Sequence, residues 1–282
     1  MAVAATRNLF AATKKPIGVQ LYTVRDQAEK DLPGVLAALQ KIGYKEAEPY
    51  WNIYNHPAKE LKKMLADHGL TAPSGHFDYD GLDTKFDYAQ ELGLTYMTCP
   101  MLPKDMWTSL DGFKKAADQF NKWGAEAQKR KMKFAFHNHN YEFKNLVSKN
   151  GYDQVVSGAD PHMDGFTVLL TSTDPKLVWF EMDCYWITQA GRDPVKMMNE
   201  HSGRIKMLHL KDRKPGAATS QSLDEAAMHF TEVGNGTLDW KAILAAADKN
   251  KIEHMFVEED FCDKPPMESL KISYQNLEKL MA

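Results

Sequence analysis

Short apolar runs alternate with longer amphipathic stretches along almost the whole chain, from Pro16 onward. The runs predict eight β-strands, at residues 17–21, 45–50, 72–77, 96–100, 133–139, 178–183, 205–210 and 254–259. The stretches between them carry apolar residues at helical spacing, for example Leu32, Leu36 and Leu39 after the first strand. Strands that alternate with helices build a parallel sheet, so the pattern predicts an α/β fold, a single (β/α)8 barrel.

The length of 282 residues suits one barrel of the TIM type, because such barrels run to about 250 residues. We expect residues 1–15 to be a flexible leader and residues 16–282 to form the barrel as one catalytic domain. Two irregular segments, 145–173 and 214–233, follow predicted strands and are candidate lids or substrate loops. The first should contain a long loop and then a short helix. Three aspartates are expected to begin helices: Asp111, Asp193 and Asp239.

Composition excludes several classes of protein. The chain is 43% hydrophobic and 26% charged, as is usual for soluble globular proteins, and its net charge of −3 gives no general attraction to nucleic acid or membrane lipid. No run of 18 apolar residues predicts a membrane helix, and three scattered cysteines predict no disulfide framework. Arg7 interrupts the leader, so we expect a cytoplasmic protein, or a periplasmic one if a native leader was trimmed. A homo-oligomer remains possible.

Four of the predicted strands end in side chains that can bind a metal. Glu142, Asp183, His209 and Glu258 lie at or just past the ends of strands five to eight, which a parallel barrel brings to one end. A single carboxylate at such a position more often caps a helix or faces solvent. Four equivalent positions instead predict a site for one divalent cation, Mn²⁺, Mg²⁺, Co²⁺ or Zn²⁺.

The segment HNHNYE adds two histidines to this end of the barrel. His137 and His139 alternate along a strand, so both point to one face while Asn138 points to the other. A single strand histidine is more often a structural hydrogen-bonding residue, but two on one face favour a lining of the barrel mouth. We therefore count His137 and His139 as candidate catalytic residues.

Further polar residues stand at strand ends. Glu48 and His76 are candidate substrate-binding residues, and Lys211, two positions after His209 on the same strand face, is a candidate catalytic residue. The alternative for each of these residues is a structural role in core packing. The glycine turn of residues 233–240, VGNGTLDW, has backbone amides that could hold a phosphate or a hydroxyl group. The chain has no dinucleotide fingerprint, Walker motif or nucleophile elbow.

The metal site suggests a type of chemistry. A divalent cation would polarise neighbouring carbonyl and hydroxyl oxygens of a polyol, and would stabilise the enediolate formed when a carbon-bound proton is removed. Carboxylates beside that carbon could take up and return the proton.

Six motifs together point to a known family. They are GVQLYTVRD at 18–26, HNHNYEF at 137–143, MDCYW at 182–186, LHLKD at 208–212, VGNGTLDW at 233–240 and VEED at 257–260. In these motifs the chain resembles the xylose isomerase-like TIM-barrel superfamily, and within it the sugar phosphate isomerases/epimerases, relatives of inosose dehydratase and tagatose-type 3-epimerases. The resemblance covers nearly the whole chain from Pro16.

The resemblance implies roles for particular residues. One metal would be held by Glu142, Asp183, His209 and Glu258, and the two glutamates would act as an acid/base pair on opposite faces of the sugar. Glu142 departs from the pattern of the simple epimerases, because it lies beyond its strand in an HNHxxE arrangement.

These observations lead us to expect a metal-dependent isomerase or epimerase that acts on a sugar, keto sugar or sugar phosphate. Two alternatives remain open at this point. One is a metal-dependent lyase or dehydratase that eliminates water or a glycoside from a keto sugar, with His137, His139 or Lys211 as the acid for the leaving group. The other is a barrel that binds a carbohydrate without catalysis.

Overall fold

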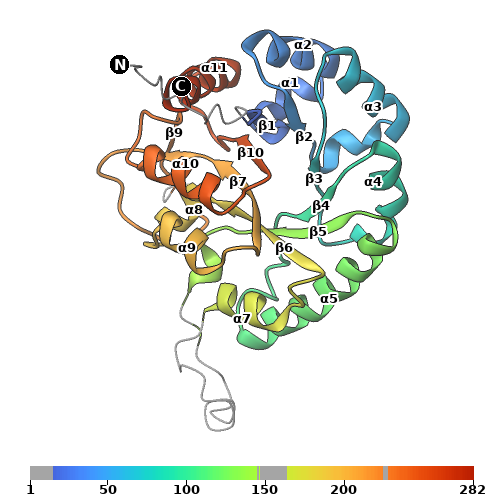
Figure 1. The fold of residues 1–282 in the computed structure, drawn as a ribbon, viewed down its shortest axis with the longest axis vertical. Coiled ribbons are helices and arrows are strands. Elements are labelled where there is room, and N and C mark those ends of the chain that lie inside the picture. Colours follow the sequence, from blue (N-terminus) through green and yellow to red (C-terminus); the bar gives the residue numbers. More distant parts are fainter. Residues whose placement is uncertain (1–14, 145, 147–163, 225–227) are drawn as a thin grey trace, which may run out of the picture.

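Eight parallel strands form the centre of the molecule, surrounded by helices (Figure 1). The structure is a computed structural model that describes residues 15–144, 146, 164–224 and 228–282. The sheet order is β2-β1-β10-β7-β6-β5-β4-β3. The strands are β1 Gly18–Gln20, β2 Glu46–Glu48, β3 Ser74–His76, β4 Tyr96–Cys99, β5 Lys133–His137, β6 Val178–Asp183, β7 Ile205–Leu210 and β10 His254–Val257. Each lies within a predicted range.

The two edge strands of this sheet, β2 and β3, approach each other and nearly close the barrel. The backbone N–H of Ala47 donates to the carbonyl oxygen of Thr71 over 2.9 Å, and that of His76 donates to Pro49 over 2.8 Å. Because the remaining neighbours pair in parallel register, the predicted barrel fold is confirmed.

The helices follow the strands around the outside of the barrel (Figure 1). The longer ones are α2 Leu32–Ile42, α3 Ala58–Asp67, α4 Phe86–Leu92, α5 Leu110–Lys129, α7 Gly165–Ser172, α9 Pro194–Glu200, α10 Trp240–Lys249 and α11 Pro266–Leu280. The shorter ones are α1 Arg25–Ala28 and α8 Cys184–Gln189, together with 3-10 turns at Leu21–Val24, Trp51–Asn55, Leu82–Thr84 and Tyr141–Phe143. None of the described helices is both long and apolar enough to cross a bilayer.

The predicted helix starts were correct in two cases of three. Asp193 and Asp239 cap α9 and α10, and each accepts a hydrogen bond from backbone N–H groups of the first turn. Asp111 does not begin its helix. The cap is Ser109, whose hydroxyl accepts a hydrogen bond from the N–H of Gly112. Asp111 therefore lies inside the first turn, where its negative charge interacts favourably with the helix dipole.

Alternation along the strands separates the outer core from the barrel interior. Residues such as Phe134, Phe180 and Leu208 point outward and pack against the helices. The interior near the amino ends of the strands is filled by a separate apolar cluster: Tyr96, Ala135, Met207 and Phe256, with Trp179 against it. Gly18 permits this filling, because a Cβ there would collide with the ring of Phe256.

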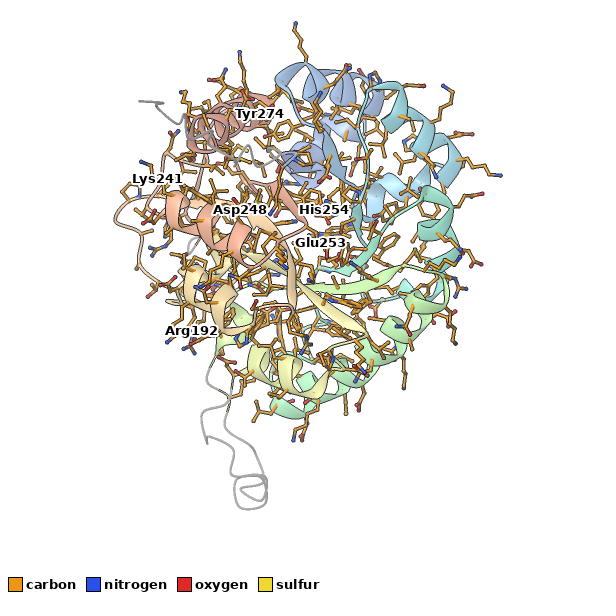
Figure 2. All side chains as sticks on the ribbon, viewed as in Figure 1. Arg192, Lys241, Asp248, Glu253, His254 and Tyr274 are labelled. Atoms are coloured by element: carbon orange, nitrogen blue, oxygen red, sulfur yellow. The ribbon has the colours of Figure 1, made fainter. Side chains whose placement is uncertain are left out.

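Polar pairs close the amino end of the barrel beneath this cluster. Nδ1 of His254 lies 3.0 Å from Oε1 of Glu46, and Oε2 of Glu253 accepts from the hydroxyl of Tyr96 over 2.7 Å. Figure 2 labels Glu253 and His254 near the centre of the ring of helices. The apolar layer therefore separates these pairs from the polar residues at the opposite, carboxyl end of the strands.

The two irregular segments have different outcomes. In the first, α7 is the expected short helix, while residues 145 and 147–163 lie outside the described part of the chain. In the second, β8 Asp212–Arg213 pairs with β9 Phe230–Thr231 in an antiparallel ladder that we did not predict. Residues 225–227 are not described. Most of the expected leader, residues 1–14, is also outside the described residues.

Candidate active site

Asp183 lies at the carboxyl end of β6, where its side chain caps a helix and its backbone is also hydrogen-bonded. Its Oδ1 accepts a hydrogen bond from the N–H of Trp186 over 2.9 Å and so caps α8. Its own N–H donates to Oδ1 of Asn138 over 3.2 Å. The other carboxylate oxygen, Oδ2, is buried and accepts no hydrogen bond from the described residues. Burial raises the pKa of Asp183 to about 6.

His209 and Glu258 complete a compact group with Asp183. Nδ1 of His209 lies 2.9 Å from Oε2 of Glu258 and 3.9 Å from Oδ2 of Asp183. All three side chains are buried, and their candidate ligand atoms lie within 4.8 Å of one another. We call these three residues the oxygen-rich group. Their side chains meet because each occupies an interior-facing position at or just past the carboxyl end of its strand.

Lys211 places a positive charge beside this group. Its ammonium nitrogen Nζ lies 2.7 Å from Oε2 of Glu258, 3.2 Å from Oδ2 of Asp183 and 2.5 Å from Oδ2 of Asp260. The rings of Trp186 and Phe230 lie 5.5 and 5.3 Å from Nζ. Burial would lower the pKa of Lys211, but the surrounding carboxylates raise it well above its usual value.

The contact with Lys211, which raises the pKa of the lysine, lowers the pKa of Glu258. Its burial would raise its pKa, yet Lys211 and His209 hold that pKa well below the usual range. At neutral pH Glu258 is therefore a carboxylate and Lys211 an ammonium group, and each stabilises the charged form of the other.

Glu142, the fourth predicted metal ligand, does not join the oxygen-rich group. Its two carboxylate oxygens accept hydrogen bonds from the backbone N–H of His139, over 3.1 and 3.0 Å. The chain leaves β5 at His137 and turns into the 3-10 helix Tyr141–Phe143, so the carboxylate folds back on its own loop. Burial raises the pKa of Glu142 to about 8.

A second group of metal-capable atoms lies one layer deeper in the barrel. It consists of His76, His137, Glu181 and His209, whose ligand atoms also lie within 4.8 Å of one another. We call it the histidine-rich group. Glu48 adjoins it, with Oε2 2.8 Å from Nε2 of His209. Burial is the main cause that lowers the pKa of His137 to about 3.

His139 lies just past the end of β5, beside His137 and Trp186. Its ring centre lies 5.1 Å from that of His137 and 5.2 Å from that of Trp186. Burial lowers its pKa well below the usual value, and its Nδ1 has no hydrogen-bond partner among the described residues. A neutral imidazole with a free nitrogen can bind a cation.

Sequence reasoning missed three residues of this centre: Gln20, Glu181 and Asp260. Glu181 precedes Asp183 by two positions and Asp260 follows Glu258 by two, so strand alternation places each on the same face as its neighbour. Gln20 ends β1 and donates to Oε2 of Glu48 over 2.9 Å. The period-two pattern could therefore have identified all of them.

The glycine turn at 233–240 has a different function from the one we considered. The carboxylate of Asp212 accepts hydrogen bonds from the N–H groups of Gly234, Gly236 and Leu238 and from the indole N–H of Trp240. These amides are already bound and cannot hold a phosphate. Asp212 instead anchors the turn to the segment that follows β7, directly after Lys211.

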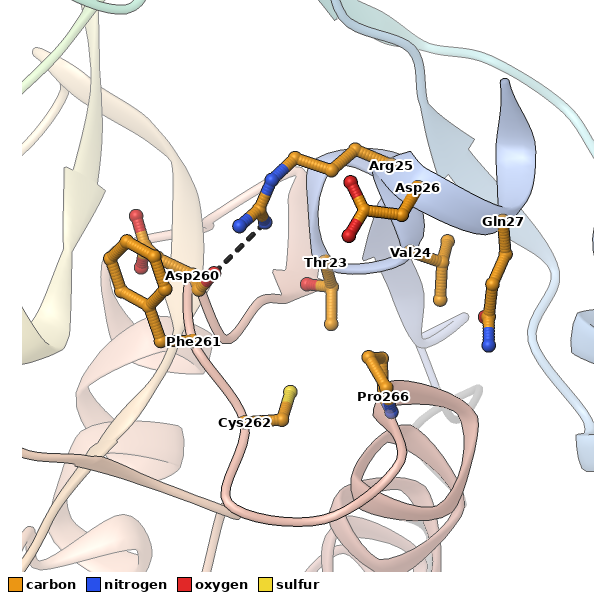
Figure 3. A pocket seen from close by; sticks show the side chains of 9 residues that line it. All are labelled: Thr23, Val24, Arg25, Asp26, Gln27, Asp260, Phe261, Cys262 and Pro266. Carbon is orange, nitrogen blue, oxygen red and sulfur yellow. Dashed lines mark hydrogen bonds between the residues drawn. The ribbon is translucent and has the colours of Figure 1, made fainter. Parts of the chain in front are cut away.

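A cavity of about 260 Å³ lies between the loops that follow β1 and β10. Figure 3 shows Arg25 reaching across it to the backbone oxygen of Asp260, a hydrogen bond of 2.9 Å. The side chain of Phe261, on the same wall, is 46% exposed. Because Asp260 also contacts Lys211, this cavity adjoins the oxygen-rich group.

The fold and this arrangement of residues define the class of protein. The chain belongs to the xylose isomerase-like TIM barrel family, whose model matches residues 36–280. An inosose dehydratase of Clostridium beijerinckii is 23% identical over 256 residues, which cover 80% of each protein. The family expected from the sequence motifs is thereby confirmed, and it is a family of enzymes.

Solved structures agree with this assignment. A sugar phosphate isomerase/epimerase of Parabacteroides distasonis matches with a TM-score of 0.77 at 25% identity, over 95% of this chain and 98% of that one. The IOLI protein, crystallised with a zinc atom, matches with a TM-score of 0.69 over 94% and 98%. Its 14% identity supports the shared fold alone.

Proposed function

We propose that this protein is a metal-dependent lyase that eliminates water or an alcohol from a keto sugar or keto polyol. The observation that carries the proposal is the contact of 2.7 Å between the carboxylate of Glu258 and the ammonium group of Lys211. Elimination needs one base for the carbon-bound proton and one acid for the departing oxygen. Epimerisation needs a base on each face of the carbon, and Glu142, the expected second base, is bound to the backbone of His139.

The oxygen-rich group fits a divalent cation. Oδ2 of Asp183 is buried and has the Lys211 ammonium group at 3.2 Å but no hydrogen bond among the described residues, and the donor set combines two carboxylates with one imidazole. Asp183, His209 through Nδ1, and Glu258 would hold the ion, a smaller set than the predicted one because Glu142 is turned away. A bound cation would supply Lewis-acid polarisation of the substrate carbonyl.

The chain's own residues carry the proton transfers. The carboxylate of Glu258 accepts the proton from the carbon next to the substrate carbonyl, and the electrons of that C–H bond form an enolate. The enolate then re-forms the carbonyl as the C–O bond at the next carbon breaks. Lys211 gives a proton to the departing oxygen, so water or an alcohol leaves and an α,β-unsaturated ketone remains. The proton held by Glu258 passes to solvent or returns through Lys211.

An isomerase or epimerase is the second candidate. It is favoured by the similarity to the Parabacteroides distasonis isomerase/epimerase and by Glu142, whose pKa of about 8 keeps it mostly protonated at neutral pH and able to act as the acid of an acid/base pair. In that reaction the enolate is protonated again without loss of an oxygen. Glu142 would have to release the N–H of His139 to reach a substrate.

Incubation with a panel of keto sugars, keto polyols and keto-glycosides in D₂O, with added Mn²⁺, tests both candidates. A lyase produces an unsaturated ketone, seen as new ultraviolet absorbance, and free water or alcohol. An isomerase produces a saturated product that carries carbon-bound deuterium. Glu258→Gln should lower either activity by about 10³-fold, while Glu60→Gln, an exposed glutamate on α3, should leave it unchanged. A saturated, deuterated product and no unsaturated ketone would overturn the lyase proposal.

A further inference from the structure

The histidine-rich group converges three imidazole nitrogens on one carboxylate oxygen. Oε2 of Glu181 lies 2.7 Å from Nε2 of His76, 3.1 Å from Nδ1 of His137 and 3.2 Å from Nε2 of His209. None of the four side chains is more than 5% exposed. Five strands of the barrel thus enclose these atoms together with the neighbouring Glu48.

The spacing of these atoms suits direct coordination of an ion. Zinc binds imidazole nitrogen and carboxylate oxygen at about 2.0–2.2 Å in a tetrahedron, which places neighbouring ligand atoms roughly 3.3 Å apart. Two of the three distances to Glu181 are within a few tenths of an ångström of that value. A small rotation of the His76 side chain would lengthen the third distance, 2.7 Å, to a value that suits coordination.

Hydrogen bonds within the group leave carboxylate oxygens unsatisfied. Oε1 of Glu181 and Oε1 of Glu48 are both buried and accept no hydrogen bond from the described part of the chain. Unpaired buried carboxylate oxygens are unfavourable, and a cation between the two glutamates and the imidazoles would compensate them. Lys211 does this for the oxygen-rich group, but no lysine or arginine side chain has a hydrogen bond or ion pair with Glu181 or Glu48 among the described contacts.

We propose that His76, His137, Glu181 and His209 form a second cation site, which binds a nitrogen-preferring divalent ion such as Zn²⁺ or Co²⁺. Its three imidazoles distinguish it from the oxygen-rich group, whose two carboxylates suit Mn²⁺ or Mg²⁺ better. The two sites therefore select different ions within one barrel.

His209 couples the two sites because each uses a different nitrogen of its ring. Nδ1 faces Glu258, and Nε2 faces Glu48 and Glu181. A neutral imidazole has one N–H and one nitrogen lone pair. It can therefore bind one ion through one nitrogen, while the other nitrogen donates its N–H to a carboxylate. One cation at a time is thus expected, and Zn²⁺ in the histidine-rich group displaces Mn²⁺ from the oxygen-rich group.

Co²⁺ is the probe for this site, because its visible absorption reports binding and geometry without any substrate. The full chain, freed of metal with a chelator, is titrated with Co²⁺ as wild type and as His76→Gln, His137→Gln and Asp183→Asn. X-ray absorption of the Co²⁺-loaded wild type counts the imidazole ligands, and competition between Mn²⁺ and Zn²⁺ is followed by electron paramagnetic resonance of released Mn²⁺. Far-ultraviolet circular dichroism checks that each variant is folded.

We expect His76→Gln and His137→Gln to weaken Co²⁺ binding by more than about 100-fold, and Asp183→Asn by no more than about tenfold. X-ray absorption should find the three imidazoles of the group, and Zn²⁺ should release Mn²⁺. Normal Co²⁺ affinity in both histidine variants, or a single imidazole on the bound ion, would overturn the site. If one histidine variant does not fold, the Co²⁺ affinity of the other variant and the number of imidazole ligands in the wild type decide whether the site exists. Failure of the elimination assay with intact Co²⁺ binding would affect only the proposed reaction.

Discussion

Lys211 and Glu258 form an ion pair at the carboxyl end of the barrel strands, with 2.7 Å between Nζ and Oε2 and almost no exposure of either side chain. Asp183 and Asp260 lie against the same ammonium group. A buried cation thus already balances carboxylates that would otherwise repel one another. The same charge balance makes the centre sensitive both to substitution of Lys211 and to added metal.

Lys211→Met should lower the free energy of unfolding by ~3–5 kcal/mol, because it leaves buried carboxylates without their cation. Saturating Mn²⁺ should restore a large part of this loss, since the ion would bind the folded state at Asp183 and Glu258, two of the carboxylates that lose their cation. Urea unfolding with and without Mn²⁺ measures both effects, with Lys122→Met on the exposed face of α5 as control. Equal stability of Lys211→Met and wild type without metal would contradict this account.

Asp183 caps α8 and is one of the metal ligands that we propose, and two substitutions separate these roles. Asp183→Asn keeps a capping oxygen for the N–H of Trp186, so stability should stay near the wild-type value while Mn²⁺ affinity falls by more than about 100-fold. Asp183→Ala should lose the affinity and also about 1 kcal/mol of stability. Calorimetric Mn²⁺ titration and urea unfolding distinguish the two. Equal Mn²⁺ affinity in Asp183→Asn and wild type would remove this residue from the metal site.

Asp212 should be essential for stability although it contacts no reacting group. Asp212→Ala would leave the buried indole N–H of Trp240 and three part-buried backbone N–H groups without an acceptor, for a loss of ~3–5 kcal/mol. Gly236→Ala should also destabilise, because its Cβ would collide with the carboxylate of Asp212. Thermal and urea unfolding test this, with Asp118→Ala on the exposed side of α5 as control. A loss no larger than the control's would mean that the turn holds without Asp212.

Glu232 should make stability depend on pH below about 4.5. Its burial would raise its pKa, but hydrogen bonds from Lys264, Asn235 and Ser269 lower that pKa to about 2. A carboxylate with a lowered folded-state pKa stabilises above its unfolded pKa of about 4.3, and this contribution is lost as pH falls towards 2.

Glu232→Gln should therefore lower the free energy of unfolding at pH 7 by about 1–2 kcal/mol, and its difference from wild type should shrink between pH 4.5 and 2. Urea unfolding across that range, beside Glu60→Gln, gives the two curves. A difference that stays constant down to pH 2 would mean that the charge of Glu232 is not what stabilises.

The strands and half of the site could be predicted because they depend on local patterns. Apolar runs with period two define each strand, and the last interior-facing residue of a strand in a parallel barrel must point to its carboxyl end. Asp183, His209 and Glu258 follow from that rule. Glu181 and Asp260 lie two residues before and after such positions, so the period of two puts them on the same face, but attention to strand ends alone left them out.

The sequence by itself determined that this chain is a (β/α)8 barrel with carboxylates, imidazoles and one lysine at a single end. The alternation of residues within each strand and the succession of strands and helices along the chain can both be read from local patterns. Only the tertiary structure decided which of these side chains meet. The turn after β5 directs Glu142 to the backbone of His139, and Asp212 takes up the amides of the glycine turn. Barrel closure and register set the distances between strands, and they place His209 between two groups of possible ligands. Such distances depend on packing between segments far apart in the chain, which no local pattern contains.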